Sequence, residues 1–392
     1  MNPHILLVGA RDTEVAKIHR LGIDITLLQK QQLVTPLQLS CARKVIQMDY
    51  ENHAAVENIA REIHKDYRIS AILSFTEYGL LPAAICADKL GFSANSVKPV
   101  FYTRDKIKMR SLLLNNGLGI HFRECKSIND VYDFFAQNNN KPIIIKPSNL
   151  SGSQGVSKIN HISDIAQAWQ WSNPSEKTTI IAEEFLEGQE FSVETLSFNG
   201  QHEIIAITEK MTTDNDHFIE IGHQLPARLT QDVQNEIANV VMHFLNVIEQ
   251  TTGPVHTEIR YTSEGPKIIE SQTRIGGGQI FKMVELVTGV DLVSETVCRI
   301  LNLNYKRDKG LYNAMAVRMI AYENKQVKAV SNLDNIARLP GIISVECNIK
   351  AGDILGKLNS SDARQGYILA SGEKVEEAII NANRGLVELT IS

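Results

Sequence analysis

The sequence predicts an α/β protein with several lobes, and three observations support this class. The first hundred residues alternate short apolar runs with helical patterns, an order typical of a small parallel βαβ sheet. Strand signals dominate from residue 178 to residue 221, which indicates a second, largely β region. The chain of 392 residues also exceeds the usual limit for one hydrophobic core, so we expect two or three domains or lobes.

The first lobe is expected to contain four strands, at His4–Val8, Asp24–Leu28, Lys44–Gln47 and Ala71–Ser74. Helical patterns occupy Ala54–His64 and Leu80–Leu90, and Gly91 is a natural C-cap for the second helix. Gly9 follows the first strand, but the GxGxxG and GxxxxGK(S/T) patterns are missing there. The lobe is therefore not predicted to be a dinucleotide or P-loop site.

The pattern changes near residue 105. The elements expected from there on are a helix at Asp105–Asn115, a βαβ-like unit that leads into a strand at 142–147, a long helix at Gln231–Gln250, a hairpin of Val255–Tyr261 and Lys267–Gln272, and, beyond Ala314, several strands with a closing helix at Lys374–Leu386.

Composition excludes several classes of partner. A formal net charge of -5 provides no electrostatic footprint for nucleic acid or an anionic membrane. No apolar run approaches the ~20 residues that span a bilayer, and the start of the sequence lacks the basic region of a signal peptide. The five cysteines are scattered and odd in number, as expected for reduced thiols in a cytoplasmic protein.

Two glutamates of the predicted hairpin are its most informative residues. If Thr262 and Pro266 flank a three-residue loop, Glu258 lies opposite Glu270 on the same face. Facing carboxylates repel each other, and a bound cation removes that conflict. Mg²⁺ prefers a few carboxylate oxygens and completes its shell with water and phosphates. The hairpin thus predicts a metal site, with a solvated pair of glutamates as the alternative.

Three further segments carry groups suited to a nucleotide. Arg274 follows Glu270 and precedes Gly276–Gly278, so it could neutralise a transferring phosphoryl group, although a surface arginine at a turn is the alternative. The small residues of 148–155 follow a strand lysine and could expose backbone N–H groups to an anion, unless they form only a linker. The acceptors of 183–190 suit adenine and ribose, or form a plain acidic turn.

The order of these motifs resembles the ATP-grasp superfamily over nearly the whole chain. The resemblance implies that the triphosphate contacts Lys106, at a helix start that reads Asp-Lys, and Lys146, at a strand end. It also implies a phosphate-covering loop with Ser151, Gly152, Ser153 and Gly155. The adenine–ribose hinge implied by it comprises Glu183, Glu184, Phe185, Leu186 and Glu190.

The same resemblance implies that Glu258 and Glu270 bind Mg²⁺, with Mn²⁺ as a substitute, and that Arg274 contacts the transferred phosphoryl group. The family often has Glu-x-Asn at the second metal site, whereas this chain has Glu270-Ser271-Gln272. Glutamine supplies the same amide oxygen on a longer stem, so Gln272 is left open as a ligand.

Within that superfamily the chain is most similar to the L-amino-acid ligases, which join two amino acids. The resemblance rests on three segments: the Glu-x-Gly-His-x-x-Pro-Ala pattern at 220–227, Val255-His256-Thr257-Glu258, and Thr76-Glu77-Tyr78-Gly79. Glu77 and Glu220 could pair with a substrate ammonium, and His223 could polarise the acyl group or accept a proton. The substrate carboxylate and the oxyanion would then contact Arg274, Gly276, Gly277 and Gly278.

Each of these residues also has a structural alternative. His223 could be a satisfied turn histidine, Glu77 an exposed charge at a helix N-terminus, and His256 a structural residue.

The resemblance implies an ATP-grasp fold with an N-terminal α/β domain at 1–104, a mobile lid subdomain at 105–188, a catalytic lobe at 189–310 and a C-terminal β-rich subdomain at 311–392. It implies a carboxylate–amine ligase that forms an acyl phosphate and releases ADP and phosphate. The alternatives are an ATP-grasp carboxylase, an enzyme similar to the purine-pathway transformylase, and a non-catalytic nucleotide-binding module. The expected partners are small carboxylates and amines, and a homodimer stays open.

Overall fold

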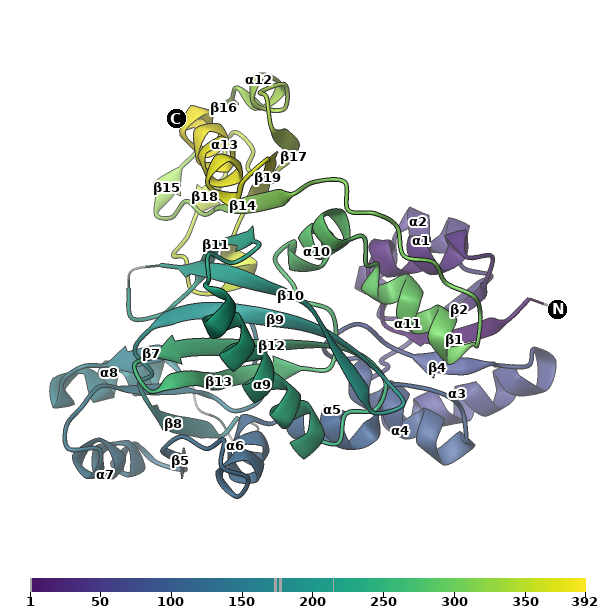
Figure 1. The fold of residues 1–392 in the computed structure, drawn as a ribbon, viewed down its shortest axis with the longest axis horizontal. Helices are drawn as coiled ribbons and strands as arrows, with labels where there is room; N and C mark the ends of the chain where they lie inside the picture. Colours follow the sequence, from purple (N-terminus) through teal and green to yellow (C-terminus); the bar gives the residue numbers. More distant parts are fainter. Residues whose placement is uncertain (1, 173–174, 176–177, 214) are drawn as a thin grey trace.

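A computed structural model describes residues 2–172, 175, 178–213 and 215–392, and the predicted α/β class is confirmed (Figure 1). Asp214, which belongs to the stretch predicted to be rich in strands, lies outside the described residues. The N-terminal lobe (purple to blue), the lid, the central sheet and the C-terminal part (yellow) follow one another along the chain, and the central sheet contacts all of the others (Figure 1).

The N-terminal lobe is a parallel sheet with the strand order β3-β2-β1-β4. Its strands are β1 (His4–Val8), β2 (Asp24–Gln29), β3 (Lys44–Gln47) and β4 (Ala71–Leu73). Its helices are α1 (Asp12–Arg20), α2 (Pro36–Cys41), α3 (His53–Asp66), α4 (Leu80–Leu90) and α5 (Val97–Thr103). Every residue of β1 is buried, as expected for a strand covered on both faces. The four predicted strands and the Gly91 cap, with φ of 72°, are confirmed.

The predicted lid, residues 105–188, contains a second four-stranded sheet, with the order β5-β8-β6-β7. Its elements are α6 (Lys106–Leu114), β5 (Phe122–Cys125), α7 (Ile128–Gln137), β6 (Ile143–Pro147), β7 (Ser157–Ile159), α8 (Ile165–Trp171) and β8 (Ile180–Glu184). The βαβ-like unit predicted here is split, because β8 lies between β5 and β6 and runs antiparallel to both. Strand β8 thereby carries the predicted adenine hinge to the sheet centre.

The central sheet has eight strands in the order β13-β12-β9-β10-β11-β14-β19-β17. The elements of its first part are β9 (Gln189–Phe198), β10 (Gln201–Thr212), β11 (Glu220–Leu225), α9 (Gln231–Val247), β12 (Gly253–Thr262), β13 (Gly265–Gln272), α10 (Ile280–Thr288) and α11 (Leu292–Ile300). Val241 and Phe244 of α9 pack on one face of this sheet together with Met109 of α6. On the other face, α10 and α11 connect the sheet to the N-terminal lobe (Figure 1).

The C-terminal part extends the central sheet, because β14, β19 and β17 continue it beyond β11. Its elements are β14 (Ala314–Ile320), β15 (Lys325–Gln326), β16 (Val330–Ser331), α12 (Leu333–Ile336), β17 (Ile342–Cys347), β18 (Ile354–Leu355), β19 (Gly366–Gly372), α13 (Val375–Glu388) and β20 (Thr390–Ile391). Helix α13 packs on β14 and β19 through Ala378 and Ala382. The segment between β18 and β19 reaches the lid loop, where the Ser361 amide donates to the Gly152 carbonyl at 2.9 Å.

The turn of the hairpin formed by β12 and β13, which carries the predicted metal ligands, differs from the predicted turn; this hairpin is called the metal-site hairpin below. Thr262 pairs with Gly265, so the loop has two residues rather than the three expected between Thr262 and Pro266. The register then shifts between Glu258 and Ile259, and the predicted pairing of Glu258 with Glu270 results. The loop is one residue shorter than predicted, and the β-bulge, which the sequence did not predict, adds one residue to β13. The two differences cancel, so the predicted pair is still formed.

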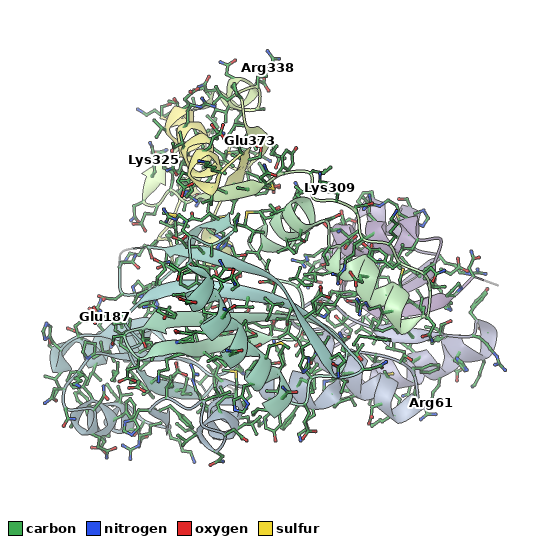
Figure 2. All side chains as sticks on the ribbon, viewed as in Figure 1. Arg61, Glu187, Lys309, Lys325, Arg338 and Glu373 are labelled. Carbon is green, nitrogen blue, oxygen red and sulfur yellow. The ribbon has the colours of Figure 1, made fainter. Side chains whose placement is uncertain are left out.

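Exposed charged side chains such as Arg61, Glu187 and Arg338 lie around the outside of the molecule (Figure 2). Among the helices of the described residues, none is long and apolar enough to cross a membrane.

Candidate active site

A cavity of about 360 Å³ lies where the lid, the central sheet and the C-terminal part meet. Most of the predicted site residues line it: Lys106, Lys146, Ser151, Gly152, Ser153, Glu183, Glu184, Phe185, Leu186, Glu190, Glu220, Glu258, Glu270, Gln272, Arg274, Gly277 and Gly278. Four others, Glu77, Gly155, His223 and Gly276, are not among its lining residues, and their surroundings are described below. Residues more than 160 positions apart in the sequence thus converge on one space.

Lys106 is the first residue of α6, and its position follows from the cap of that helix. The Asp105 carboxylate accepts hydrogen bonds from the amides of Ile107 and Lys108, which satisfies donors that have no partner inside the helix. The Lys106 ammonium donates to the Leu150 carbonyl at 2.6 Å and lies 3.3 Å from Glu270 Oε2. It therefore connects the phosphate loop with the predicted metal site.

Lys146 belongs to a buried charge cluster on the floor of the cavity. Its ammonium lies 2.7 Å from Glu183 Oε2, while Glu183 Oε1 accepts from Arg110 Nε at 2.6 Å. Burial opposes the ionisation of Glu183, but the charges of Arg110 and Lys146 outweigh it and lower its pKa to about 2. Glu183 is consequently an anchor for Lys146 as well as a member of the predicted hinge.

An amide oxygen without a hydrogen-bond donor in the described residues lies beside the predicted metal ligands. Gln272 donates to Glu270 Oε1 through Nε2 at 2.5 Å, and its own Oε1 is buried and has no hydrogen-bond partner among the residues that the structure describes. An unsatisfied buried carbonyl oxygen is costly, and a cation would satisfy it. In the part of the chain that the structure describes, no cluster of three or more His, Cys, Asp or Glu side chains could hold a metal alone. The residues fit Mg²⁺ with phosphate oxygens as further ligands.

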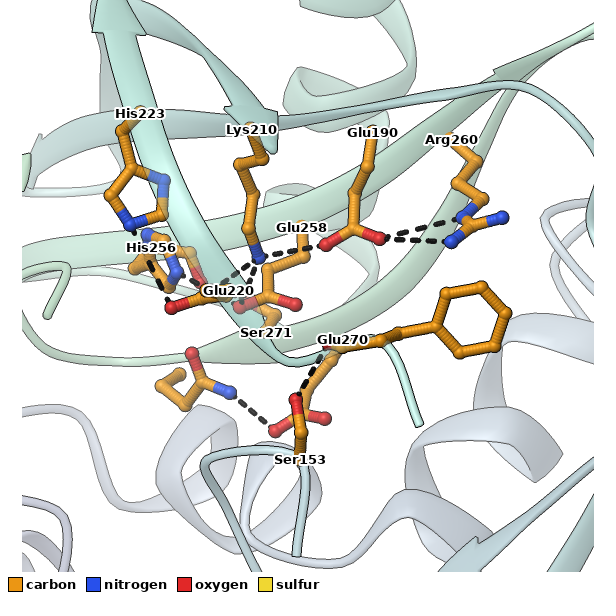
Figure 3. A network of polar contacts seen from close by, with 12 residues as sticks. Ser153, Glu190, Lys210, Glu220, His223, His256, Glu258, Arg260, Glu270 and Ser271 are labelled. Atoms are coloured by element: carbon orange, nitrogen blue, oxygen red, sulfur yellow. Dashed lines mark hydrogen bonds and ion pairs between the residues drawn. The ribbon is translucent and has the colours of Figure 1, made fainter. Parts of the chain in front are cut away.

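Lys210 of β10 occupies the centre of the acidic side of the cavity, and the sequence reasoning missed it. Its side chain is 1% exposed, and its ammonium lies 2.8 Å from Glu190, 2.7 Å from Glu220 and 3.0 Å from Glu258 (Figure 3). Burial opposes its charge, but the three carboxylates raise the pKa of Lys210 well above its ordinary value. The ammonium of Lys210 therefore neutralises negative charge on three predicted site residues, which were assigned to the ribose, the substrate and the metal.

His256 connects the predicted metal ligand Glu258 with the glycine segment, residues 276–278. Its Nδ1 lies 2.5 Å from Glu194 Oε1 and its Nε2 lies 3.2 Å from Glu258 Oε1. Burial opposes protonation, but the Glu194 charge outweighs it and raises the pKa of His256 to about 9. Glu194, which the sequence reasoning also missed, accepts a hydrogen bond from the Gly276 amide at 3.3 Å. A side chain at Gly276 would lie 2.9 Å from His256 Nδ1, so this position needs glycine.

Arg274 is held by the N-terminal lobe. Its Nε donates to Glu77 Oε2 at 2.7 Å, and the other Glu77 oxygen forms an ion pair with Arg104. Burial opposes the ionisation of Glu77, but the charge of Arg274 and then that of Arg104 lower its pKa below the ordinary value. Both oxygens of Glu77 are thus engaged by arginines.

His223 is fully buried beneath the glycine segment. Both ring nitrogens are without hydrogen-bond partners in the described residues, and the nearest charge is Glu220 Oε2 at 3.7 Å. Burial lowers the pKa of His223 to about 4, despite the Glu220 charge, so the ring is neutral near pH 7. A side chain at Gly278 would lie 2.7 Å from His223 Nε2. The missing Cβ of Gly278 leaves this nitrogen close to the cavity wall.

The predicted adenine hinge is bordered by aromatic rings and a guanidinium. Phe185 and Phe218 stack with centroids 5.8 Å apart, and the Arg260 guanidinium lies 5.2 Å and 4.9 Å from the two centroids. Arg260 also donates to Glu190 at 3.2 Å, while Glu184 accepts from the His121 amide at 2.8 Å. The flat faces suit a base, and Glu190 lies between two cations.

The loop of small residues has a defined shape. Gly152, Ser153 and Gly155 have φ values of 67°, 58° and 69°, the left-handed conformation that glycine adopts most easily. Ser153 Oγ donates to the Phe218 carbonyl at 3.0 Å, and the Gly155 carbonyl accepts from Ser172 at 2.9 Å. Gly155 supports the loop rather than lining the cavity.

Comparisons with known proteins agree with this architecture. Residues 139–282 match the ATP-grasp domain, residues 15–93 match the ATP-grasp N-terminal domain, and residues 318–392 match the L-amino acid ligase C-terminal domain 2. The chain therefore contains an ATP-grasp domain with an ATP-grasp N-terminal domain before it. Its C-terminal domain is of the L-amino acid ligase type, and the predicted relationship to that branch is confirmed.

Individual relatives support the same relationship. The L-arginine-specific L-amino acid ligase of Bacillus subtilis is 24% identical over 84% of this chain and 83% of its own length. Alanine–anticapsin ligase of Bacillus subtilis is 26% identical over 60% of this chain, which spans 55% of that protein. An uncharacterized protein of Sinorhizobium fredii matches over 48% of its length, so the chain spans about half of some relatives. The crystal structure of an L-amino acid ligase from Bacillus licheniformis superposes over the whole chain and 98% of its own, with a TM-score of 0.86 and 21% identity, and confirms the fold.

Proposed function

We propose that this protein is an ATP-dependent carboxylate–amine ligase that joins two amino acids through an acyl phosphate. The observation that carries the proposal is the convergence of two lysines, two facing glutamates and Arg274 in one cavity. Nucleotide binding alone would not need an arginine beside a paired-carboxylate site. The names of the relatives, which describe amino acid ligases, support the same reaction class.

In the first step, an oxygen of the substrate carboxylate attacks the γ-phosphorus of ATP. The bond between that phosphorus and the β,γ-bridging oxygen breaks, and ADP leaves with its electron pair. Lys106 and Lys146 neutralise the triphosphate, while Arg274 neutralises the charge that spreads over the transferring phosphoryl group. Mg²⁺, held by Glu258, Glu270 and the Gln272 amide oxygen, would supply a Lewis acid for phosphate oxygens when bound.

In the second step, the amine of the other substrate attacks the acyl carbon. A tetrahedral oxyanion forms, and phosphate leaves with the carboxylate oxygen that it acquired in the first step. The oxyanion would be stabilised by the guanidinium of Arg274 and by the backbone of Gly277 and Gly278, which line the cavity, whereas the Gly276 amide is engaged by Glu194. The neutral His223 ring beside Glu220 is suited to accept the proton that the attacking ammonium loses, which the departing phosphate then takes up.

The loop that contains Gly152 and Ser153 excludes water from the acyl phosphate. Its contacts with Phe218 and Ser361 connect the lid to the central sheet and to the C-terminal part. Acyl phosphates hydrolyse in open water, so a closed loop favours ligation over wasteful ATP hydrolysis.

Amino acids fit the charges of the substrate region. Glu220 offers a carboxylate to an ammonium group, and Arg274 offers a guanidinium to a carboxylate. Glu77 contributes by fixing Arg274, since both of its oxygens are engaged by arginines. We also propose a cytoplasmic location, where ATP and Mg²⁺ are available, and small carboxylates and amines as the substrates.

A pairwise amino acid screen tests the proposed function. Each pair is incubated with ATP and Mg²⁺, phosphate release is measured, and products are identified by mass spectrometry. The proposal predicts ADP, phosphate and a dipeptide for at least one pair. Carboxylation of a substrate, or ADP binding without phosphate release across the whole panel, would favour the carboxylase or the non-catalytic module instead.

A further inference from the structure

Arg110 is a fully buried arginine that the nucleotide and metal assignments do not use. It lies in α6, one helical turn after Lys106, and is 0% exposed. Its guanidinium donates three hydrogen bonds: from Nε to Glu183 Oε1 at 2.6 Å, from Nη1 to the Ile268 carbonyl at 2.6 Å, and from Nη2 to the Ile269 carbonyl at 2.7 Å. The two carbonyl acceptors belong to the bulge of the metal-site hairpin.

That bulge decides which residue faces Glu258. From the two-residue turn the pairs run without interruption as far as Ile259 with Ile268. If this register continued, the next pair would be Glu258 with Ile269. The structure instead pairs Glu258 with Glu270, because Ile269 is the extra residue. The facing carboxylates exist only while the bulge is maintained.

A bulge interrupts the ladder of hydrogen bonds, so its carbonyl groups need other donors. Ile268 is buried, and the Arg110 side chain has no exposed surface although it borders the cavity. A planar guanidinium presents several N–H donors in a fixed fork and can bond two neighbouring carbonyls at once. An ammonium group lacks this fixed geometry. Two neighbouring carbonyl acceptors therefore favour arginine over lysine at position 110.

We propose that Arg110 is a positioning residue that sets the metal site by holding the bulge, so that Glu270 faces Glu258. The inference rests on the proposed function, which gives the facing pair its role as metal ligands. The third hydrogen bond, to Glu183, fixes the partner of Lys146 with the same guanidinium. Helix α6 thus connects three parts of the site: Lys106 at its start, the metal hairpin and the Lys146 cluster.

The decisive variant is Arg110→Lys, which keeps a cation beside Glu183 but cannot reproduce the fork. ADP binding to the full-length protein is measured by calorimetry over a series of Mg²⁺ concentrations. We expect the Mg²⁺ concentration for half-maximal enhancement to rise by about 10- to 100-fold, the usual effect of losing an outer partner of a metal ligand. Mn²⁺ binding, followed by electron paramagnetic resonance with ADP present, should weaken in parallel.

Two matched variants separate positioning from general damage. Arg307→Met removes a guanidinium that is bonded to Glu203 and Glu295 away from the cavity, and it should leave the Mg²⁺ requirement unchanged. Glu183→Gln keeps the two carbonyl contacts of Arg110 but disturbs Lys146, so it should weaken ADP binding at every Mg²⁺ concentration alike.

An unchanged Mg²⁺ requirement in a folded Arg110→Lys variant would overturn the inference while leaving the proposed function intact. Wild-type protein that binds ADP with no response to Mg²⁺ would overturn the metal assignment itself. If Arg110→Lys does not fold, Arg110→Gln, which retains a single side-chain NH2 group but not the guanidinium fork, is subjected to the same titration and decides the question by the same criterion.

Discussion

Arg274 donates a hydrogen bond to Glu77 at 2.7 Å, although 197 residues separate the two in the sequence. Glu77 follows the last strand of the N-terminal lobe, whereas Arg274 follows the metal-site hairpin. Arg104 pairs with the second oxygen of Glu77. The N-terminal lobe therefore orients the arginine that we assign to the transferred phosphoryl group, so it contributes to the site without lining the cavity.

Replacing Glu77 by glutamine should impair catalysis without removing any group from the cavity. Arg274 would keep its charge but lose the partner that fixes its position, and small displacements of a catalytic group cost about 100-fold in rate. We expect kcat/KM for the activated amino acid to fall by about that factor. Glu62→Gln, at an exposed position of α3, serves as the control. A change of less than about threefold in Glu77→Gln would argue against the anchoring role.

Removing the charge of Lys210 should destabilise the nucleotide-free protein. Three half-buried carboxylates would remain beside one another without their fully buried partner, and breaking a buried ion pair from one side costs about 3–5 kcal/mol. The measurement is the unfolding free energy of Lys210→Met in urea. Lys309→Met, on the surface, should stay within about 0.5 kcal/mol of wild type. Equal stabilities for the two variants would contradict the balancing role of Lys210.

The low pKa of Glu183 predicts a specific pH dependence of stability. Because its pKa of about 2 lies below the ordinary value of 4.5, the ionised carboxylate stabilises the folded state above about pH 4.5. That contribution, on the order of 3 kcal/mol, is lost as the pH falls toward 2. The stability difference between wild type and Glu183→Gln should therefore shrink by about 2 kcal/mol between pH 7 and pH 3. A constant difference across this range would show that folding does not lower the pKa of Glu183.

Glu270→Ala should abolish turnover while the fold is retained. The variant removes one of the two facing carboxylates and the acceptor of the Gln272 amide. Circular dichroism and thermal unfolding establish that the chain is folded, and phosphate release measures turnover. Near-normal activity would remove Glu270 from the metal site. A Gln272→Leu variant tests the amide separately and should raise the Mg²⁺ requirement without abolishing turnover.

The sequence predicted the elements whose signals are local. The strands of the first lobe, the helix that begins at Lys106 and the pairing of Glu258 with Glu270 follow from apolar periodicity, capping and alternation. The pairing was right for a partly wrong reason, since the bulge compensated for the shorter turn. A bulge has no reliable sequence signal, because it is stabilised here by Arg110 from a distant helix.

The parts of the site that were missed depend on contacts between distant segments. Lys210 lies in a strand with no distinctive pattern, and its three partners come from β9, β11 and β12. Arg110 offered one usable signal, its place one helical turn after Lys106 on the same face. Glu77 was singled out by its motif, but its bond to Arg274 could be seen only after the N-terminal lobe had been placed against the catalytic loop.

The transfer of a carboxylate oxygen to phosphate tests the central claim most directly. Each amino acid of an active pair is labelled in turn with ¹⁸O in its carboxylate, and the products are analysed by mass spectrometry. An acyl-phosphate route predicts that one of the two amino acids delivers one ¹⁸O atom per turnover to inorganic phosphate. The nucleotide product is then unlabelled ADP. Label in AMP, or phosphate that stays unlabelled while dipeptide forms, would contradict the account.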